Sequence, residues 1–112
     1  MADTNLRAFR PAAGGTVSLA VTNASGRVAR PAAAAAAGAN AVRVVFTAGT
    51  AGARIRSGDS TVAATSADML CPNPGTPFVY AECFSIAETD TNIAAITDAG
   101  TCTVEFTFGF GQ

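Results

Sequence analysis

The stretch Thr101-Cys102-Thr103-Val104-Glu105-Phe106-Thr107-Phe108 alternates polar and apolar side chains at every position. A period of two places successive side chains on opposite faces of a β-strand, so one face of this segment is apolar and the other is polar. The sequence therefore predicts a half-buried strand, with its apolar face on a hydrophobic core and its threonine-rich face outside that core.

The same period recurs upstream. Segment 16–22 places Val17, Leu19 and Val21 on one face, and segment 41–47 does so with three further apolar residues, Val42, Val44 and Phe46. Shorter strands are predicted at 27–29, 53–56, 78–86 and 93–97, and 61–65 can extend the chain after a turn at 57–60. The Gly-rich turn 48–52 predicts a hairpin between 41–47 and 53–56. Seven to eight short strands with turns between them indicate an all-β fold, an antiparallel β-sandwich or jelly roll.

Residues 30–40 interrupt this pattern with a run of alanines from Ala32 to Ala37. Alanine favours helix, but the segment has no amphipathic face and lies between β patterns. We expect an extended connection or a weak edge strand, with a short helix as the alternative.

The domain organisation follows from where the alternation begins. Residues 1–15 are expected to form an extended N-terminal arm, and residues 16–112 a single β-sandwich domain. The arm carries an aromatic anchor in Phe9-Arg10-Pro11, and Phe110 stands between two glycines near the other end of the chain. Arms of this kind either remain disordered or become ordered against a partner, so Phe9, Arg10 and Phe110 are candidate partner contacts.

Composition argues against catalysis. The 112 residues include 26 Ala, 14 Thr and seven Arg, with no Lys, His or Trp, and the net charge is −1. Without histidine there is no Ser-His-Asp triad, no His general base and no His-ligated metal. The charge balance gives no basic footprint for nucleic acid or acidic membranes, and no run approaches the length of a membrane-spanning helix. Because the first residues have an early acid and no apolar block, we do not expect them to act as a secretory signal. We expect no enzyme activity, no cofactor and no small-molecule substrate.

Cysteines and carboxylates offer little else. Cys71, Cys83 and Cys102 lack metal-site spacing, and Cys83 and Cys102 are expected to be buried in strands, with a Cys71–Cys83 bridge as an alternative. The carboxylates are scattered. Asp59 is expected to cap a turn, and Glu88 with Asp90 is a poor match to a calcium loop.

Arginines form the remaining candidate surface. Arg54 and Arg56 share one strand face, and the predicted hairpin places Arg43 across from them. Such a cationic patch is either solvated or used for ion pairs with a protein partner.

The order of segments resembles that of small tailed-bacteriophage head proteins of the decoration or cement type. The carrying residues are Phe9-Arg10-Pro11, Val42-Arg43-Val44-Val45, Ala53-Arg54-Ile55-Arg56-Ser57-Gly58-Asp59-Ser60, Asp68-Met69, Ile93-Ala94-Ala95-Ile96 and the strand that follows Gly100. The alanine run and the loop at Cys71 depart from the pattern.

This resemblance implies a β-sandwich that binds the outside of the phage head and stabilises contacts between major capsid subunits. Such proteins act as homo-dimers or homo-trimers on the virion surface after synthesis in the bacterial cytoplasm. The alternative function is a jelly-roll receptor- or carbohydrate-binding module of a tail or head fibre, with Phe78 and Tyr80 as its aromatic candidates. A hydrolase that uses the scattered carboxylates is a third and weaker hypothesis.

Overall fold

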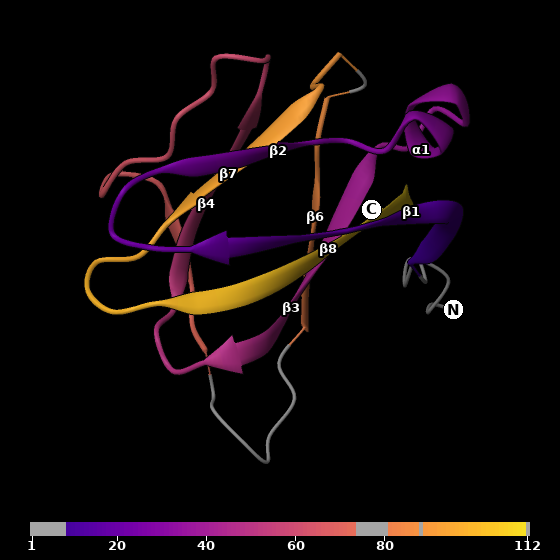
Figure 1. Ribbon diagram of the computed structural model, residues 1–112. Helices are drawn as coiled ribbons and strands as arrows, with labels where there is room; N and C mark the ends of the chain where they lie inside the picture. The colour runs from indigo at the N-terminus through magenta and orange to yellow at the C-terminus, as the bar shows by residue number, and fades with distance from the viewer. Residues whose placement is uncertain (1–8, 74–80, 88, 112) are drawn as a thin grey trace, which may run out of the picture.

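The computed structural model describes residues 9–73, 81–87 and 89–111, and the side chains of these residues except 81–84 (Figure 1). In these segments the chain forms eight strands and one short helix. The elements are β1 (Arg10–Val21), β2 (Gly26–Ala29), α1 (Ala32–Ala36), β3 (Ala41–Gly49), β4 (Ala53–Gly58), β5 (Met69–Cys71), β6 (Ala81–Ser85), β7 (Asn92–Ile96) and β8 (Cys102–Phe110).

The described strands form two four-stranded antiparallel sheets. Sheet A has the order β1-β8-β3-β6, and sheet B has the order β2-β7-β4-β5. The first strand pairs with the last, and each later strand pairs with the one next nearest the end of the chain: β1 with β8, β2 with β7, β3 with β6 and β4 with β5. This is the strand order of a jelly roll, and the predicted all-β sandwich is confirmed.

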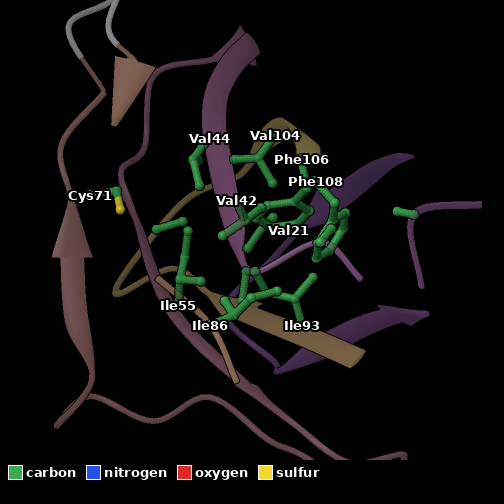
Figure 2. Close-up of a cluster of buried hydrophobic side chains, with 14 of the residues drawn as sticks. Val21, Val42, Val44, Ile55, Cys71, Ile86, Ile93, Val104, Phe106 and Phe108 are labelled. Atoms are coloured by element: carbon green, nitrogen blue, oxygen red, sulfur yellow. The ribbon is translucent and has the colours of Figure 1, made fainter. Parts of the chain in front are cut away.

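The core lies between the two sheets, and Figure 2 shows its side chains pointing toward one another. Phe106 and Phe108 are its largest fully buried members, and Val104 and Cys102 beside them complete the apolar face of β8. From β1, Val21 is fully buried while Val17 and Leu19 pack on the core from its margin. The alternation in 101–108 therefore predicted the inner face of the central strand correctly.

The predicted hairpin between 41–47 and 53–56 is wrong. β3 lies in sheet A and β4 in sheet B, so residues 50–52 carry the chain from one sheet to the other. Gly49 makes this crossing with a positive φ of 82°, where a Cβ atom would lie 2.5 Å from the Thr101 carbonyl oxygen. The same glycine-rich spacing suits a hairpin turn and a sheet-to-sheet crossing, because both need tight backbone bends.

The segment 61–65 is not a strand. Asp59 Oδ1 accepts hydrogen bonds from the Thr61 amide at 2.8 Å and the Thr61 hydroxyl at 2.7 Å. The carboxylate thereby fixes a turn immediately after β4, and the expected capping role of Asp59 is confirmed.

The alanine run forms helix α1, which corrects the expected extended connection. Pro31, with φ of −55°, precedes the helix, and Gly38 takes a positive φ of 77° after it. Pro before the first turn and Gly after the last are common helix boundaries. Ala34 is fully buried and the helix packs on β1, so tertiary contact stabilises five alanines that have no amphipathic pattern of their own.

The predicted boundary between arm and domain at residue 15 falls inside β1. Arg10 and Pro11 already pair with Phe110 and Gly109, and pairing resumes at Thr16 and Thr107 after a bulge. Four residues of β1, from Ala12 to Gly15, stand opposite Phe108 alone in this bulge. Residues 10–15 are therefore part of sheet A, and residues 1–8 lie outside the described part of the chain.

Candidate contact surfaces

The structure brings Phe9, Arg10 and Phe110 together, and we call these three residues the terminal cluster. Arg10 pairs with Phe110 across β1 and β8, and its guanidinium carbon lies 5.4 Å from the centre of the Phe110 ring. A cation at this distance from a ring is attracted by the electrons of the ring face. Both aromatic side chains are half-buried and Arg10 is exposed.

Gly109 allows this close approach. A Cβ atom at Gly109 would overlap the Arg10 carbonyl oxygen and lie 2.8 Å from Cζ of Phe9. Phe9 therefore lies directly on the backbone of β8, and the aromatic anchor of the predicted arm docks on its own domain. In Figure 1 the beginning of β1, the end of β8 and α1 lie at the same end of the sandwich.

Arg54 is held by a bidentate ion pair on the outer side of sheet B. Its Nε donates to Asp98 Oδ1 at 2.9 Å and its second guanidinium nitrogen donates to Asp98 Oδ2 at 3.0 Å. A third donor reaches the Asp68 carbonyl oxygen at 3.1 Å. The hydrogen bonds between Arg54 and Asp98 raise the pKa of Arg54 and lower the pKa of Asp98, so both groups remain charged across the neutral range.

The predicted patch of Arg43, Arg54 and Arg56 does not exist as such, because Arg43 lies on sheet A. Arg27 takes its place. Arg27 on β2 and Arg56 on β4 both pair with Ala94 of the intervening strand β7, so they flank it on the outside of sheet B. The sequence places Arg27 at the start of a short predicted strand, but residue spacing does not show which strand pairs with it.

Three carboxylates neutralise these three arginines. Asp98 pairs with Arg54, Asp68 Oδ1 lies 3.6 Å from Nε of Arg56, and the charge of Arg27 contributes to lowering the pKa of Asp59, after the larger effect of the Thr61 hydrogen bonds. The outer side of sheet B is therefore a mixed-charge surface and not a cationic one.

Segment 59–68 covers much of this side of sheet B. At one end of this segment the Ala64 amide donates to Ser25 Oγ at 2.9 Å, and at its other end Asp68 contacts Arg54 and Arg56. Ala64 and Ala94 are both buried although neither is part of the core between the sheets. The chain thus provides its own cover for sheet B.

The outer side of sheet A has no such cover from the described residues. We call it the outer A face, formed by Thr16, Ser18 and Ala20 of β1, Arg43 and Val45 of β3, and Thr103, Glu105 and Thr107 of β8. Thr16 and Thr107 join hydroxyls across the strands at 3.0 Å. Arg43 and Glu105 are its only charged members in that set, and neither enters either of the ion pairs found among the described residues.

Cys71, Cys102 and Asp90 carry groups that could take part in chemistry, and each is either buried or hydrogen-bonded within the fold. Burial raises the pKa of the Cys102 thiol, which keeps it protonated, and Cys71 lies in the core (Figure 2). Asp90 Oδ2 accepts from Ser57 Oγ at 2.8 Å and from the Ala87 amide at 3.1 Å. The described residues contain no group of three metal-binding side chains. Glu88, Phe78, Tyr80 and the Cys83 side chain lie outside the described part.

Comparison with known proteins gives no family. No protein-family model matches the sequence, and no curated protein matches it. A solved chain from Bacillus endospore appendages, described as a novel family of disulfide-linked pili, matches over 95% of this chain and 87% of that chain. The TM-score is 0.45 and the sequence identity 11%, so the likeness concerns the fold alone. Among the described segments the one helix, α1, is far too short to cross a membrane.

Proposed function

We propose that this protein is a non-enzymatic capsid decoration, or cement, protein. It binds the outside of a tailed-phage head and stabilises contacts between neighbouring major capsid subunits. The terminal cluster is the observation that carries this proposal, because it presents two half-buried aromatic rings and an exposed arginine on a rigid strand pair. Aromatic and arginine side chains dominate the binding energy of protein interfaces.

The fold supports the same proposal. Jelly rolls serve as capsid domains and as lectins, and both uses present a stable sandwich to a partner. A shell of many identical subunits offers the same binding site many times, so a contact that is weak at one site is repeated over the whole shell. The terminal cluster suits a protein partner better than a sugar, because Phe9 lies against the backbone of β8 at Gly109 and the Arg10 guanidinium already lies over the ring of Phe110.

Co-sedimentation with phage heads tests the proposal. Heads assembled from the major capsid protein of the phage that encodes this chain, stripped of decoration proteins, are mixed with the purified protein and pelleted. We expect saturable binding with hundreds of copies per head and no binding to free capsid subunits. R10E should weaken head binding by about tenfold or more, because it removes the exposed cation of the cluster.

R27E is the matched control, since it makes the same change in charge on the outer side of sheet B. Equal loss of head binding in R27E and R10E would show a general charge effect and would remove the terminal cluster from the proposal. Binding to a glycan array, without binding to heads, would support the receptor- or carbohydrate-binding module instead.

A further inference from the structure

The sandwich has four strand edges among its described strands, and the edge at β1 differs from the other three. Sheet A ends at β1 and β6, and sheet B ends at β2 and β5. The strands β2, β5 and β6 are four, three and five residues long. Each contains or adjoins a charged residue or a proline: Arg27 in β2, Asp68 and Pro72 beside β5, and Glu82 in β6. Short length, charge and proline are the features that keep a sheet edge from pairing with a further strand.

The long section of β1 lacks these features. Between Thr16 and Thr22 the sequence contains no charged residue and no proline, and β-branched side chains recur along it. At about 3.4 Å per residue this section extends for roughly 20 Å. Of the four described edges, β1 is therefore the one that retains the capacity to pair with another strand.

The direction of its backbone groups follows from the pairing of β8 with β3. At the two ends of β3, the Asn40 amide donates to the Gly109 carbonyl at 2.9 Å and the Ala51 amide donates to the Thr101 carbonyl at 3.4 Å. The odd-numbered residues of β8 thus direct their N–H and C=O groups toward β3, and the even-numbered residues direct theirs toward β1. Three residue pairs of β1 and β8 are accordingly hydrogen-bonded pairs: Val17 with Phe106, Leu19 with Val104 and Val21 with Cys102.

The intervening residues of β1, Thr16, Ser18 and Ala20, direct their N–H and C=O groups away from β8. The next residue of this series agrees, because the Thr22 carbonyl accepts from the Thr97 amide at 2.9 Å and not from β8. All three residues are exposed, and no described segment pairs with β1 on this side. We call this row of outward backbone groups the free edge of β1.

The side chains beside the free edge indicate what kind of strand fits it. Val17, Leu19 and Val28 are only partly buried and pack on the core from its margin. Strand β2 lies over this margin, since a Cβ atom at Gly26 would come within 3.7 Å of the Leu19 side chain. A strand added to β1 would place every second side chain in this apolar margin, so the segment that fits has apolar residues at alternate positions.

We infer that the free edge of β1 binds an extended, uncharged segment of the major capsid subunit, which adds to sheet A as a fifth strand. The segment bonds to the outward backbone groups of β1 and packs its apolar side chains beside Val17 and Leu19. A second copy of this chain docked by the same edge would also bring its Arg27 toward Arg27 of the first, because β1 and β2 lie on the same side of the sandwich. The inference rests on the proposed function and adds a second contact to the terminal cluster.

Two variants of one residue separate the backbone from the side chain. S18P removes the outward N–H of Ser18 and leaves the hydrogen bonds between β1 and β8, since proline is tolerated on a strand edge that faces solvent. S18A keeps this N–H and removes only the hydroxyl. In co-sedimentation with stripped phage heads, we expect S18P to weaken binding by about tenfold or more, because a carbonyl of the added strand loses its donor. S18A should bind within about twofold of the wild type, and circular dichroism verifies that both variants are folded.

A second measurement uses the wild type alone. Hydrogen exchange followed by mass spectrometry compares the free protein with the protein bound to heads. Exchange should slow in residues 16–20 on binding, because the outward amides of Thr16, Ser18 and Ala20 gain acceptors. Exchange in β5, a short edge of the other sheet, should remain unchanged.

The outcomes distinguish the inference from the proposed function. Wild-type binding to heads with S18P as tight as S18A, or without added protection in residues 16–20, would overturn the inference and leave the proposed function intact. No binding of the wild type to heads would overturn both. Protection of residues 16–20 that rises with protein concentration in the absence of heads would assign the free edge to a second copy and overturn the inference.

Discussion

Two glycines show how the local surroundings of a residue decide its tolerance to change. Gly49 and Gly38 both adopt positive φ, at 82° and 77°. A Cβ atom at Gly49 would lie 2.5 Å from the Thr101 carbonyl oxygen and 2.6 Å from Cα of Cys102, whereas one at Gly38 would meet nothing within 4 Å. Backbone strain is therefore common to both positions, and a steric clash belongs to Gly49 alone.

We expect G38A to destabilise the protein by about 1 kcal/mol, which reflects positive φ in a residue with a side chain. G49A should destabilise it by about 2–4 kcal/mol, because β3 must also move away from β8. Urea unfolding followed by circular dichroism measures both free energies of unfolding. Equal losses in the two variants would contradict the clash at Gly49.

At the level of single residues, the sequence predicted the turn at Asp59 and the outward direction of Arg54 and Arg56. These features depend on near neighbours in the chain, through an Asx-type hydrogen bond and a period of two. The partner of Arg54 could not be predicted, because Asp98 stands 44 positions away and reaches it only through the pairing of β4 with β7.

Among the elements, β1 and β8 form the pair that joins the two ends of the described chain. Their pairing is interrupted by the bulge at residues 12–15, so the short section at Arg10 and Pro11 is held separately from the long section at 16–21. The short section depends on Gly109, where the chain of β1 passes too close to admit a side chain.

G109A should separate this short section from β8 and leave the long section paired. Hydrogen exchange should accelerate at the amides of Arg10 and Ala12, and at Asn40, whose amide donates to the Gly109 carbonyl at 2.9 Å. G26A is the control, since a Cβ atom there meets only the Leu19 side chain at 3.7 Å. Unchanged exchange at these amides in G109A would contradict the close approach.

Element types were more predictable than their partners. Strand β8 and the inner residues of β1 and β3 follow from local alternation, which depends on one buried face. The assignment of β3 and β4 to different sheets does not, because a five-residue glycine-rich connection serves both outcomes. Helix α1 was expected only as the alternative to an extended connection, because its stability comes from burial of Ala34 against β1 and a run of alanines carries no pattern that indicates this burial.

Over the whole molecule, stability should depend on acidic pH through Asp59 and Asp98. Hydrogen bonds from Thr61 and Arg54, respectively, lower the pKa of each carboxyl below its ordinary value of 3.8. A depressed pKa in the folded state stabilises the protein above the unfolded-state value, and this contribution is lost as pH falls from about 4 through the folded-state pKa.

Thermal unfolding at a series of pH values from 2 to 7 measures this dependence. D98N should lower the melting temperature at pH 7 and flatten its decline below pH 4, because the substituted side chain no longer titrates. D59N should do the same independently, and the double variant should show the sum of both effects, since the two sites share no partner. A D98N curve parallel to the wild-type curve would exclude the Arg54–Asp98 pair as a source of the acid sensitivity.

The candidate surfaces also depend on strand pairing, which the sequence does not show. Phe9, Arg10 and Phe110 were selected from the two ends of the sequence as separate contacts, and their convergence follows from the pairing of β1 with β8. The outer A face, by contrast, collects residues from three strands whose order in the sheet is β1-β8-β3. The alternation within each strand shows which of its residues face outward, but only the strand order shows that these residues form one continuous face.

The place of β8 has a consequence for how the protein is made. The strand that joins β1 to β3 at the centre of sheet A is the last of the described strands to leave the ribosome. Until residues 102–110 emerge, β1 lacks its neighbour, and the side chains that will cover Val42 and Val44 are missing. Folding of this domain therefore waits until residues 102–110 have left the ribosome, and nascent chains that stall before residue 102 expose core side chains that β8 would cover.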